Sequence, residues 1–381
     1  MKLAIVSHTE HFRDAHGKIV GWGPTVREIN YLAKQFEYIY HIGCLYASSA
    51  PNSSIPYTEK NVEFVPLPPF GGKKLINKIS VLTTAFPIIR TINKIKNKVG
   101  AIQLRLPTGM GNYLLPYLTL NRPAASIWVK YAGNWNATDV PPGYRFQRWW
   151  LKKNYLQCPV TINGKWRDQP KHCISLENPC ISAEEQSRGR VLIPTKSFNA
   201  PLTAVFVGRL EKSKGVDRII EAIPALYKKG VRTLHFIGGG DKLDHYRAEA
   251  GRISMGMNVC FHGFTSRDRI SEVLIASHLL LLPSDNEGFP KVIAEGANYG
   301  CVPVVSSISS IPHYINDKNG FLWSIENISF RTFVETLDLS SENLSAKSRC
   351  VFEVSKLFTF ERNNQNILTL LKDITAQVPE I

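Results

Sequence analysis

The chain has 381 residues, 44% of them hydrophobic, which suits one large domain or two ordinary ones and excludes the collagen-like and low-complexity classes. Its seven scattered cysteines include no C-x-x-C pair, which argues against a zinc site or a disulfide framework and favours reduced thiols in a cytoplasmic protein. The net charge of +15 points to a polyanionic partner: a nucleic acid, an anionic lipid surface or a phosphorylated ligand.

The N-terminal half alternates strands and helices. Residues 2–8 (KLAIVSH) predict a buried strand rather than a signal peptide, because a short apolar run gives way at once to polar residues. A helix is expected over 26–36, where apolar side chains recur at helical spacing. Further strands are predicted at 101–107, 126–132 and 158–164. This alternation is typical of a parallel sheet covered by helices.

No membrane-spanning helix is expected. The longest uncharged stretch, 106–121, contains Pro107 and Pro116 and falls short of the ~20 apolar residues that a span needs. The chain should therefore be soluble or lie on a surface.

Residues 186–202 are polar, interrupted by proline and without periodicity, so they are predicted to be a linker. A second α/β series follows, with strands at 203–210, 232–240, 258–264, 277–284 and 301–307, helices at 215–230 and 290–300, and a final helix at 360–374 capped by Thr359. The predicted fold class is α/β with two Rossmann-like domains. Their predicted extents are 1–185, the linker 186–202, 203–355, and a C-terminal helix over 356–381.

The turn after the strand at 277–284 carries candidate chemistry. Glu287 precedes Gly288, Phe289 and Pro290, and Glu295 lies about 7.5 Å farther along the expected helix. A helix start beyond a parallel strand favours a phosphate, while a carboxylate deeper along the helix suits the two hydroxyls of a ribose. The alternative is that both glutamates are solvated surface residues.

A second loop supplies positive charge. Arg209 and Lys214 follow the strand at 203–210, where they could neutralise a diphosphate leaving group. The alternative here is a solvated basic loop.

Together these residues resemble a known family. GRLEKSKG (208–215) followed by EGFPKVIAEG (287–296), with FIGGGDKL and VCFHGFTSRDRI between them, resembles the retaining GT-B glycosyltransferases of family 4, the glycosyl transferases group 1. The resemblance is strong over 204–325 and weaker over 1–180, where GWGPTVREI, IQLRLP, VKYAGNW and VTINGKW are similar to bacterial polysaccharide and lipopolysaccharide transferases.

The resemblance implies a GT-B fold, with the two domains facing across a cleft and the C-terminal helix packing back on the N-terminal domain. It implies catalytic roles for Arg209, Lys214 and Glu287, with Glu295 on the ribose and Glu287 facing the donor sugar. The further donor-binding residues that it implies are Gly23, Gly208, Gly263, Phe264, Gly288, Phe289 and Pro290.

No cofactor or metal is expected beyond a nucleoside-diphosphate-sugar as donor substrate. A catalytic base is not visible: Asn134 stands where related sequences often have Asp, and an amide cannot take a proton, which suits a front-face mechanism. His16 and Asn134 are the acceptor-side candidates. The Gly238–Asp241 turn and the Gly21–Gly23 loop are each either plain turns or ligand contacts.

Two basic stretches interleave cations with apolar residues, at 73–98 and, around two tryptophans, at 145–155. Such surfaces fit an anionic membrane contact or an ordinary solvated face. Nucleic acid is not expected as a partner, because no binding-fold signature is present.

The favoured function is a cytoplasmic glycosyltransferase, either free or peripheral on the cytoplasmic face of the membrane, that transfers a sugar with retention to a hydroxyl of a lipid-linked or cell-surface glycan. The alternatives are a nucleotide-sugar epimerase of the same fold, which needs no acceptor, and a non-catalytic nucleotide-binding protein.

Overall fold

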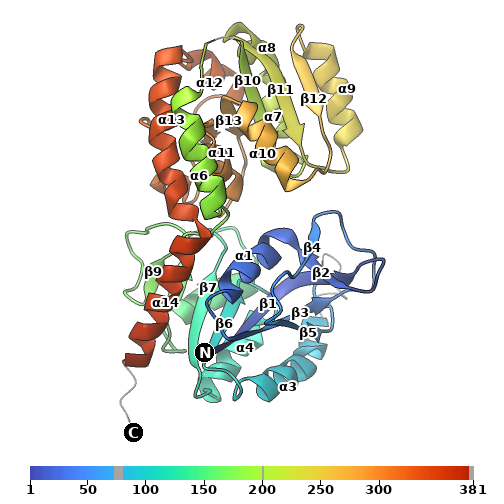
Figure 1. Cartoon of the computed structure of the whole chain (residues 1–381), viewed down its shortest axis with the longest axis vertical. Helices are drawn as coiled ribbons and strands as arrows, with labels where there is room; N and C mark the ends of the chain where they lie inside the picture. Colours follow the sequence, from blue (N-terminus) through green and yellow to red (C-terminus); the bar gives the residue numbers. More distant parts are fainter. Residues whose placement is uncertain (73–79, 200, 377–381) are drawn as a thin grey trace. The chain divides into compact units, whose positions relative to one another are not determined.

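The computed structural model of the chain describes residues 1–72, 80–199 and 201–376 (Figure 1). The chain divides into two compact units, Met1–Asn178 together with Phe360–Ile381, and Pro179–Thr359. Each is an α/β unit built on its own sheet, as the sequence predicts. Within the described residues, no helix combines the length and the apolar character that crossing a membrane requires.

The first unit is built on a mainly parallel sheet. Its described strands are β1 (Lys2–Arg13), β2 (Ile19–Trp22), β3 (Tyr38–Leu45), β4 (Ser54–Pro56), β5 (Val62–Leu67), β6 (Ala101–Leu106), β7 (Ser126–Tyr131), β8 (Val160–Ile162) and β9 (Cys173–Ser175). From the central β1, parallel strands extend through β3 and β5 on one side and through β6, β7, β8 and β9 on the other. The short strands β2 and β4 add an antiparallel extension at the end of β1.

The helices of this unit include α1 (Gly23–Ala33), α3 (Ala85–Ile95), α4 (Gly111–Leu120), α5 (Pro142–Lys152) and α14 (Phe360–Ala376). The chain's last helix, α14, packs on α1, with the rings of Tyr31 and Phe360 stacked 4.1 Å apart. Asn364 donates to the carbonyl of Tyr31 at 3.0 Å, and Ile367 joins the core shared by α1, β1 and β7. The expected packing of the C-terminal helix on the N-terminal domain is therefore confirmed.

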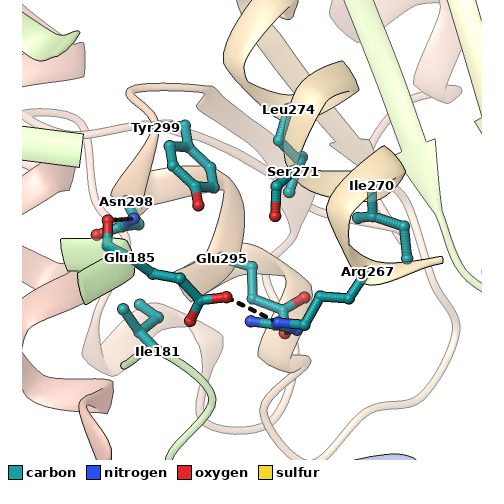
Figure 2. A pocket seen from close by; sticks show the side chains of 9 residues that line it. All are labelled: Ile181, Glu185, Arg267, Ile270, Ser271, Leu274, Glu295, Asn298 and Tyr299. Atoms are coloured by element: carbon teal, nitrogen blue, oxygen red, sulfur yellow. Dashed lines mark hydrogen bonds and ion pairs between the residues drawn. The ribbon is translucent and has the colours of Figure 1, made fainter. Parts of the chain in front are cut away.

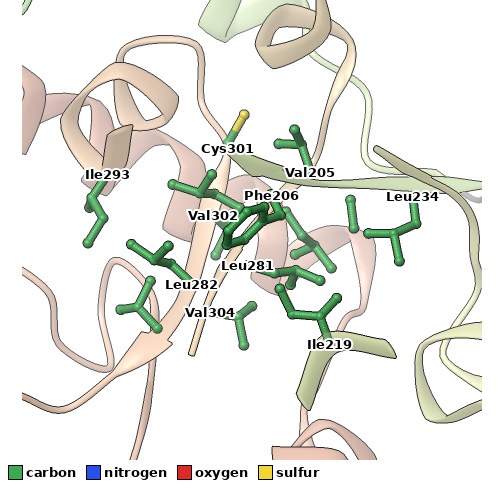
Figure 3. Packing of buried hydrophobic residues seen from close by; sticks show 14 of the residues in the cluster. Val205, Phe206, Ile219, Leu234, Leu281, Leu282, Ile293, Cys301, Val302 and Val304 are labelled. Atoms are coloured by element: carbon green, nitrogen blue, oxygen red, sulfur yellow. The ribbon is translucent and has the colours of Figure 1, made fainter. Parts of the chain in front are cut away.

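The second unit has a fully parallel sheet in the order β12-β11-β10-β13-β14-β15. The strands are β10 (Leu202–Val207), β11 (Val231–Ile237), β12 (Asn258–Phe261), β13 (Leu279–Leu282), β14 (Val302–Ser306) and β15 (Phe321–Trp323). All four leucines of β13 are buried, because helices cover both faces of the sheet, and this explains the uninterrupted apolar run in the sequence. Figure 3 shows Leu281 and Leu282 among core side chains from neighbouring strands and helices.

The helices of this unit form two groups. The group α7 (Val216–Glu221), α8 (Ile223–Lys228), α9 (Leu243–Ile253) and α12 (Phe330–Thr336) is held together by its own contacts, as is the group α6 (Ala183–Leu192), α10 (Arg267–Ala276), α11 (Lys291–Asn298) and α13 (Ser341–Ser355). One expected helix differs: 215–230 forms α7 and α8 with a break at Ala222. Pro224 explains the break, because its ring lacks an N–H and clashes with the preceding turn.

The segment predicted to be a linker is folded. Residues 186–202 hold most of α6, the short 3-10 helix η1 (Ile193–Thr195) and the start of β10, and the second unit begins at Pro179. A capping box explains α6, since Ser182 accepts from the N–H of Glu185 and the Glu185 carboxylate accepts from the N–H of Ser182. At Gly189 an added Cβ would lie 2.1 Å from the carbonyl oxygen of Asn298, so only glycine permits the observed approach of α6 to α11.

Candidate functional site

The loops that carry the candidate residues of the second unit leave neighbouring strands. β10 is the first strand of this sheet along the chain, with β11 on one side and β13 on the other, so the strand order reverses between β10 and β13. In open α/β sheets, ligands bind beyond the carboxyl ends of strands at such a reversal. The loop 208–215 follows β10, and the loop 283–290 follows β13.

These two loops are joined tightly. The N–H of Asp285 donates to the carbonyl of Ser213 at 2.9 Å, and Arg218 both donates to the carbonyl of Pro283 at 2.8 Å and pairs with Asp285 at 2.6 Å. Gly215 has a φ of +78°, and an added Cβ would lie 2.1 Å from the Pro283 oxygen. The glycine therefore permits both the turn and the close approach, and the loops form one rigid feature.

The joined loops bring a cation and a carboxylate together. Lys214 Nζ lies 2.6 Å from Glu287 Oε1, with 28% and 12% of the two side chains exposed. Arg209 is far more open, at 69%, and pairs with Glu211 in its own loop. The sequence analysis gave Lys214 a role at the diphosphate and Glu287 a role at the donor sugar. The structure adds that the two side chains form an ion pair.

The turn into α11 is fixed from several sides. The carbonyl of Gly288 accepts from Ser310 Oγ at 2.9 Å, and the buried ring of Phe289 stacks on Phe358 at 4.5 Å. Pro290 is the N-cap residue of α11, with extended backbone, rather than its first helical residue as the sequence suggested. No side-chain cap hydrogen bond is made at this helix start, so its first amides and the helix dipole favour an anion beside Gly288.

The loops after β10, β11 and β12 also meet. The N–H of Gly208 donates to Ile237, and that of Gly238 donates to Gly263, each at 2.9 Å. Gly239 packs against the ring of Phe264, which is 62% exposed. The structure thus places the donor candidates Gly208, Gly263 and Phe264 around the 238–240 turn, at the same edge of the sheet as Lys214 and Glu287.

Glu295 lies in a pocket formed by residues of α6, α10 and α11 (Figure 2). Its Oε1 accepts from Arg267 Nη1 at 2.8 Å, and the same guanidinium donates through Nε to Glu185 Oε1 at 2.8 Å. Burial alone would lower the pKa of Arg267, but the neighbouring carboxylates of Glu295 and Glu185 outweigh it and raise that pKa. Arg267 and Glu185 were not predicted from the sequence; the signal available for Arg267 was a serine followed by arginine at the start of the helix after β12.

The glycines of the Gly21–Gly23 loop in the first unit pack against other residues of the same unit. The N–H of Gly23 donates to the carbonyl of Ser53 at 2.9 Å, and a Cβ on Gly23 would lie 2.8 Å from that oxygen. A Cβ on Gly21 would lie 2.4 Å from the ring of His11. Close packing within the protein therefore accounts for both glycines, and contact of Gly23 with a donor stays a prediction.

The acceptor-side candidates occupy turns. His16 is exposed, and its backbone N–H donates to Asp14 Oδ1 at 2.9 Å. Asn134 Oδ1 accepts from the N–H of Asn136 at 3.1 Å, and Arg148 on α5 donates to the carbonyls of Trp135 and Ala137 in the same loop. The Asn134 side chain thus stabilises the local backbone. This structural role stands next to the predicted role on the acceptor side.

A buried polar cluster of the first unit was not anticipated. His11 and His41 are fully buried, and both rings contact the hydroxyl of Tyr57, His11 at 2.8 Å. Burial lowers the pKa of His11 to about 4 and lowers that of His41. Both rings are therefore neutral near pH 7.

Next to these histidines, β6 and β7 place Arg105 directly opposite Lys130, and both donate to Glu28 Oε1 of α1, at 2.8 and 2.6 Å. Like charges facing each other across two strands are destabilising, so this carboxylate is needed there. The carboxyl halves of the strands under α1 are consequently polar, while their amino halves are apolar.

Comparison with known proteins assigns part of the chain. Residues 193–346 match the family described as Glycosyl transferases group 1. The chain is 36% identical over 108 residues to the lipopolysaccharide glucosyltransferase WaaG of Escherichia coli K12, an alignment that covers 28% of each protein. It is 29% identical over 168 residues to a GDP-mannose-dependent phosphatidylinositol dimannoside mannosyltransferase of Mycobacterium tuberculosis, covering 44% of this chain and 43% of the relative. The matched regions thus span less than half the length of either relative.

Among solved structures, HepE of Anabaena in complex with UDP superposes with a TM-score of 0.66, covering 98% of this chain and all of that one at 15% identity. At this identity the likeness shows the fold, and the fold is GT-B: two Rossmann-like units. The predicted fold class is confirmed in that respect.

Proposed function

We propose that the chain is a group 1 glycosyltransferase that moves a sugar from a nucleoside-diphosphate-sugar to a hydroxyl of a lipid-linked or cell-surface glycan. The observation that carries the proposal is the meeting of Lys214 and Glu287 at the strand-order reversal, beside the uncapped start of α11. The match of residues 193–346 to the group 1 family supports it. The acceptor class is supported by the relatives named for lipopolysaccharide and phosphatidylinositol mannoside synthesis.

The proposed roles follow from charge and position. As the bond from the anomeric carbon to the diphosphate oxygen breaks, negative charge develops on the departing diphosphate. Lys214, Arg209 and the amides at the start of α11 would stabilise it, and electrostatic stabilisation of this kind is usually the largest single contribution to catalysis. Glu287 faces the sugar and keeps Lys214 oriented.

We further propose that transfer retains the anomeric configuration and needs no metal ion, in line with the family 4 resemblance. In that mechanism the acceptor hydroxyl attacks from the face that the diphosphate leaves, and the departing phosphate oxygen takes its proton. No enzyme nucleophile is then required. The buried, neutral histidines of the first unit and the Asn134 amide are consistent with this proposal.

A ligand panel tests the donor class. The full chain should melt at a higher temperature with one nucleoside diphosphate among UDP, GDP, ADP and CDP, and with the matching sugar nucleotides, because a ligand that binds only the native state adds RT ln(1 + [L]/Kd) to the stability. At 100 times Kd the increment is about 2.7 kcal/mol. The UDP complex of a structural neighbour makes UDP the first candidate. If none of the four nucleotides raises the melting temperature, the proposal is contradicted. In a separate activity assay, formation of product in the absence of an acceptor would favour the epimerase alternative.

We propose that the protein acts while bound to an anionic membrane surface. On α3, Phe86 is 75% exposed, Leu82 just before the helix is 72% exposed, and Lys94 and Lys98 are exposed at its far end. On α5, the half-exposed Trp149 lies 5.5 Å from the ring of Tyr155. Helices that carry both cations and exposed aromatic or aliphatic side chains suit a lipid headgroup region. Part of the predicted basic stretch, 73–79, lies outside the described residues.

Changing Lys94, Lys96 and Lys98 to glutamine should reduce binding to vesicles that contain anionic lipid. Each cation near such a surface contributes about 1 kcal/mol, so the triple variant should bind roughly 100-fold more weakly at low salt. The difference should shrink as salt rises, because the screening length is about 8 Å at 0.15 M. Co-sedimentation with vesicles at low and high salt measures it.

The matched control changes Lys18, Lys60 and Lys171, three exposed lysines on loops of the same unit, and removes the same charge. If both triple variants lose binding equally, net charge alone explains the attraction. If neither does, the basic stretch is an ordinary solvated face.

A further inference from the structure

The pocket around Glu295 is built on a single guanidinium. Arg267, at the start of α10, donates from three nitrogens to three acceptors: Nε to Glu185 Oε1 at 2.8 Å, Nη1 to Glu295 Oε1 at 2.8 Å, and Nη2 to the carbonyl of Cys180 at 2.7 Å. Figure 2 shows the Arg267 side chain running between the two carboxylates. Only the planar, rigid fork of an arginine can serve three acceptors in this way.

Glu185, one of the three acceptors, is itself held in place by a further hydrogen bond. Glu185 Oε2 accepts from the N–H of Ser182, which closes the capping box of α6, while its Oε1 accepts from Arg267. A continuous line of hydrogen bonds therefore joins the start of α6, the start of α10 and the side chain of Glu295 on α11. Helix α6, most of which lies in the segment predicted to be a linker, therefore borders the pocket.

The second carboxylate oxygen of Glu295 is not used by this arrangement. Arg267 occupies Oε1 of Glu295, whereas Oε2 has no hydrogen-bond partner in the part of the chain that the structure describes. The Glu295 side chain is 16% exposed, within the pocket. Two carboxylates share one guanidinium, which leaves a net negative charge that suits a neutral donor of hydroxyl hydrogens rather than a phosphate.

We propose that Arg267, held by Glu185 and the Cys180 carbonyl, is a positioning residue that fixes the carboxylate of Glu295 with Oε2 directed at a ribose hydroxyl of the donor nucleotide. This inference rests on the proposed function, in which Glu295 binds the ribose. Without Arg267 the carboxylate of Glu295 would rotate freely. A hydrogen bond to the ribose would then require the carboxylate to be ordered first, which would weaken binding. The discrimination between ribose and deoxyribose should therefore depend on Arg267, although Arg267 itself does not touch the ribose.

Calorimetry with the full chain tests the inference, using UDP and its 2′-deoxy and 3′-deoxy analogues, or the GDP series if the panel above selects GDP. A hydrogen bond to a charged group contributes about 1.5–3 kcal/mol, so wild type should bind UDP roughly 10- to 100-fold more tightly than the analogue that lacks the contacted hydroxyl. In Arg267→Met this ratio should fall to about 3-fold or less, through weaker binding of UDP and little change for the analogue.

Two further variants separate positioning from folding. Arg267→Lys keeps the charge but offers one nitrogen in place of three, so it should fold as wild type does and still lose most of the ratio. Arg269→Met is the matched control: this exposed arginine, two residues along the same helix, pairs with Glu272 at 2.7 Å and should keep the full ratio. Melting temperatures of all variants are measured alongside, with no ligand present.

The outcomes are distinct. A ratio that survives in folded Arg267→Met or Arg267→Lys would overturn the positioning role and leave the donor site intact. A wild type that binds UDP and both analogues equally would overturn the ribose contact itself, and with it the donor site of the proposed function. If Arg267→Met alone fails to fold, the Arg267→Lys ratio decides.

Discussion

Replacing Lys214 or Arg209 with alanine should each lower the turnover number of sugar transfer by about 10²- to 10³-fold, the scale of about 2.7–4 kcal/mol measured when one preorganised electrostatic donor is removed. Both side chains lie in the loop after β10, at the strand-order reversal. Each stabilises charge that appears only as the diphosphate departs. The loss should therefore fall on kcat more than on the binding of the intact sugar nucleotide, and steady-state kinetics with saturating donor measures it.

Lys212 supplies the matched control for this prediction. It belongs to the same 3-10 turn as Lys214 (η2, Lys212–Lys214) and is exposed, yet it makes no contact with Glu287 among those recorded for the described residues. Lys212→Ala should leave kcat within about 2-fold of wild type, the small effect usual for a surface substitution. Near-normal turnover in both Lys214→Ala and Arg209→Ala would remove the basis for the donor site.

The two glutamates of the motif should separate nucleotide binding from chemistry. Glu295→Ala should weaken binding of the free nucleoside diphosphate by roughly 10- to 100-fold, because a charged acceptor of a ribose hydrogen bond is lost. Glu287→Ala should leave that affinity within about 3-fold but lower kcat by about 10²-fold or more, because the orientation of Lys214 and the contact with the sugar are lost together. Calorimetry with the diphosphate and kinetics with the sugar nucleotide make the two measurements.

Glu326, an exposed glutamate in the loop between β15 and α12, is the control for both substitutions, and Glu326→Ala should change neither quantity. Equal losses of nucleotide affinity in Glu287→Ala and Glu295→Ala would show that the two carboxylates do not divide the work. Loss of affinity in Glu287→Ala alone would reverse the assignment.

Much of this fold is visible in the sequence because its strands are buried on both faces. Uninterrupted apolar runs such as Leu279–Leu282 mark parallel strands, and the loops between them carry glycines and charges, so β10, β11 and β13 are predicted close to their observed limits. The loop residues of the site follow from the same pattern, since carboxyl ends of parallel strands share one edge. The pattern indicates where Lys214 and Glu287 lie.

Contacts between side chains far apart in the chain cannot be predicted from that pattern of apolar runs and loops. The pairing of Lys214 with Glu287 and the bridge from Glu185 through Arg267 to Glu295 depend on loops and helices that meet only after folding. The α6 helix escaped prediction because its amphipathic pattern is weak. It is defined instead by the capping box at Ser182 and by the close approach of Gly189 to α11.

The path of the chain has a consequence for synthesis. The second unit is one continuous segment, Pro179–Thr359, whereas the first is completed only by Phe360–Ile381 at the other end of the chain. Helix α14 supplies Ile367, Leu370 and Leu371 to the core beside α1, so the surface that it covers stays uncovered until α14 itself has been made. Domains usually fold in the order in which they leave the ribosome. Here the half that is translated first must wait for α14, which follows the whole second unit, so the second unit can reach its native state before the first.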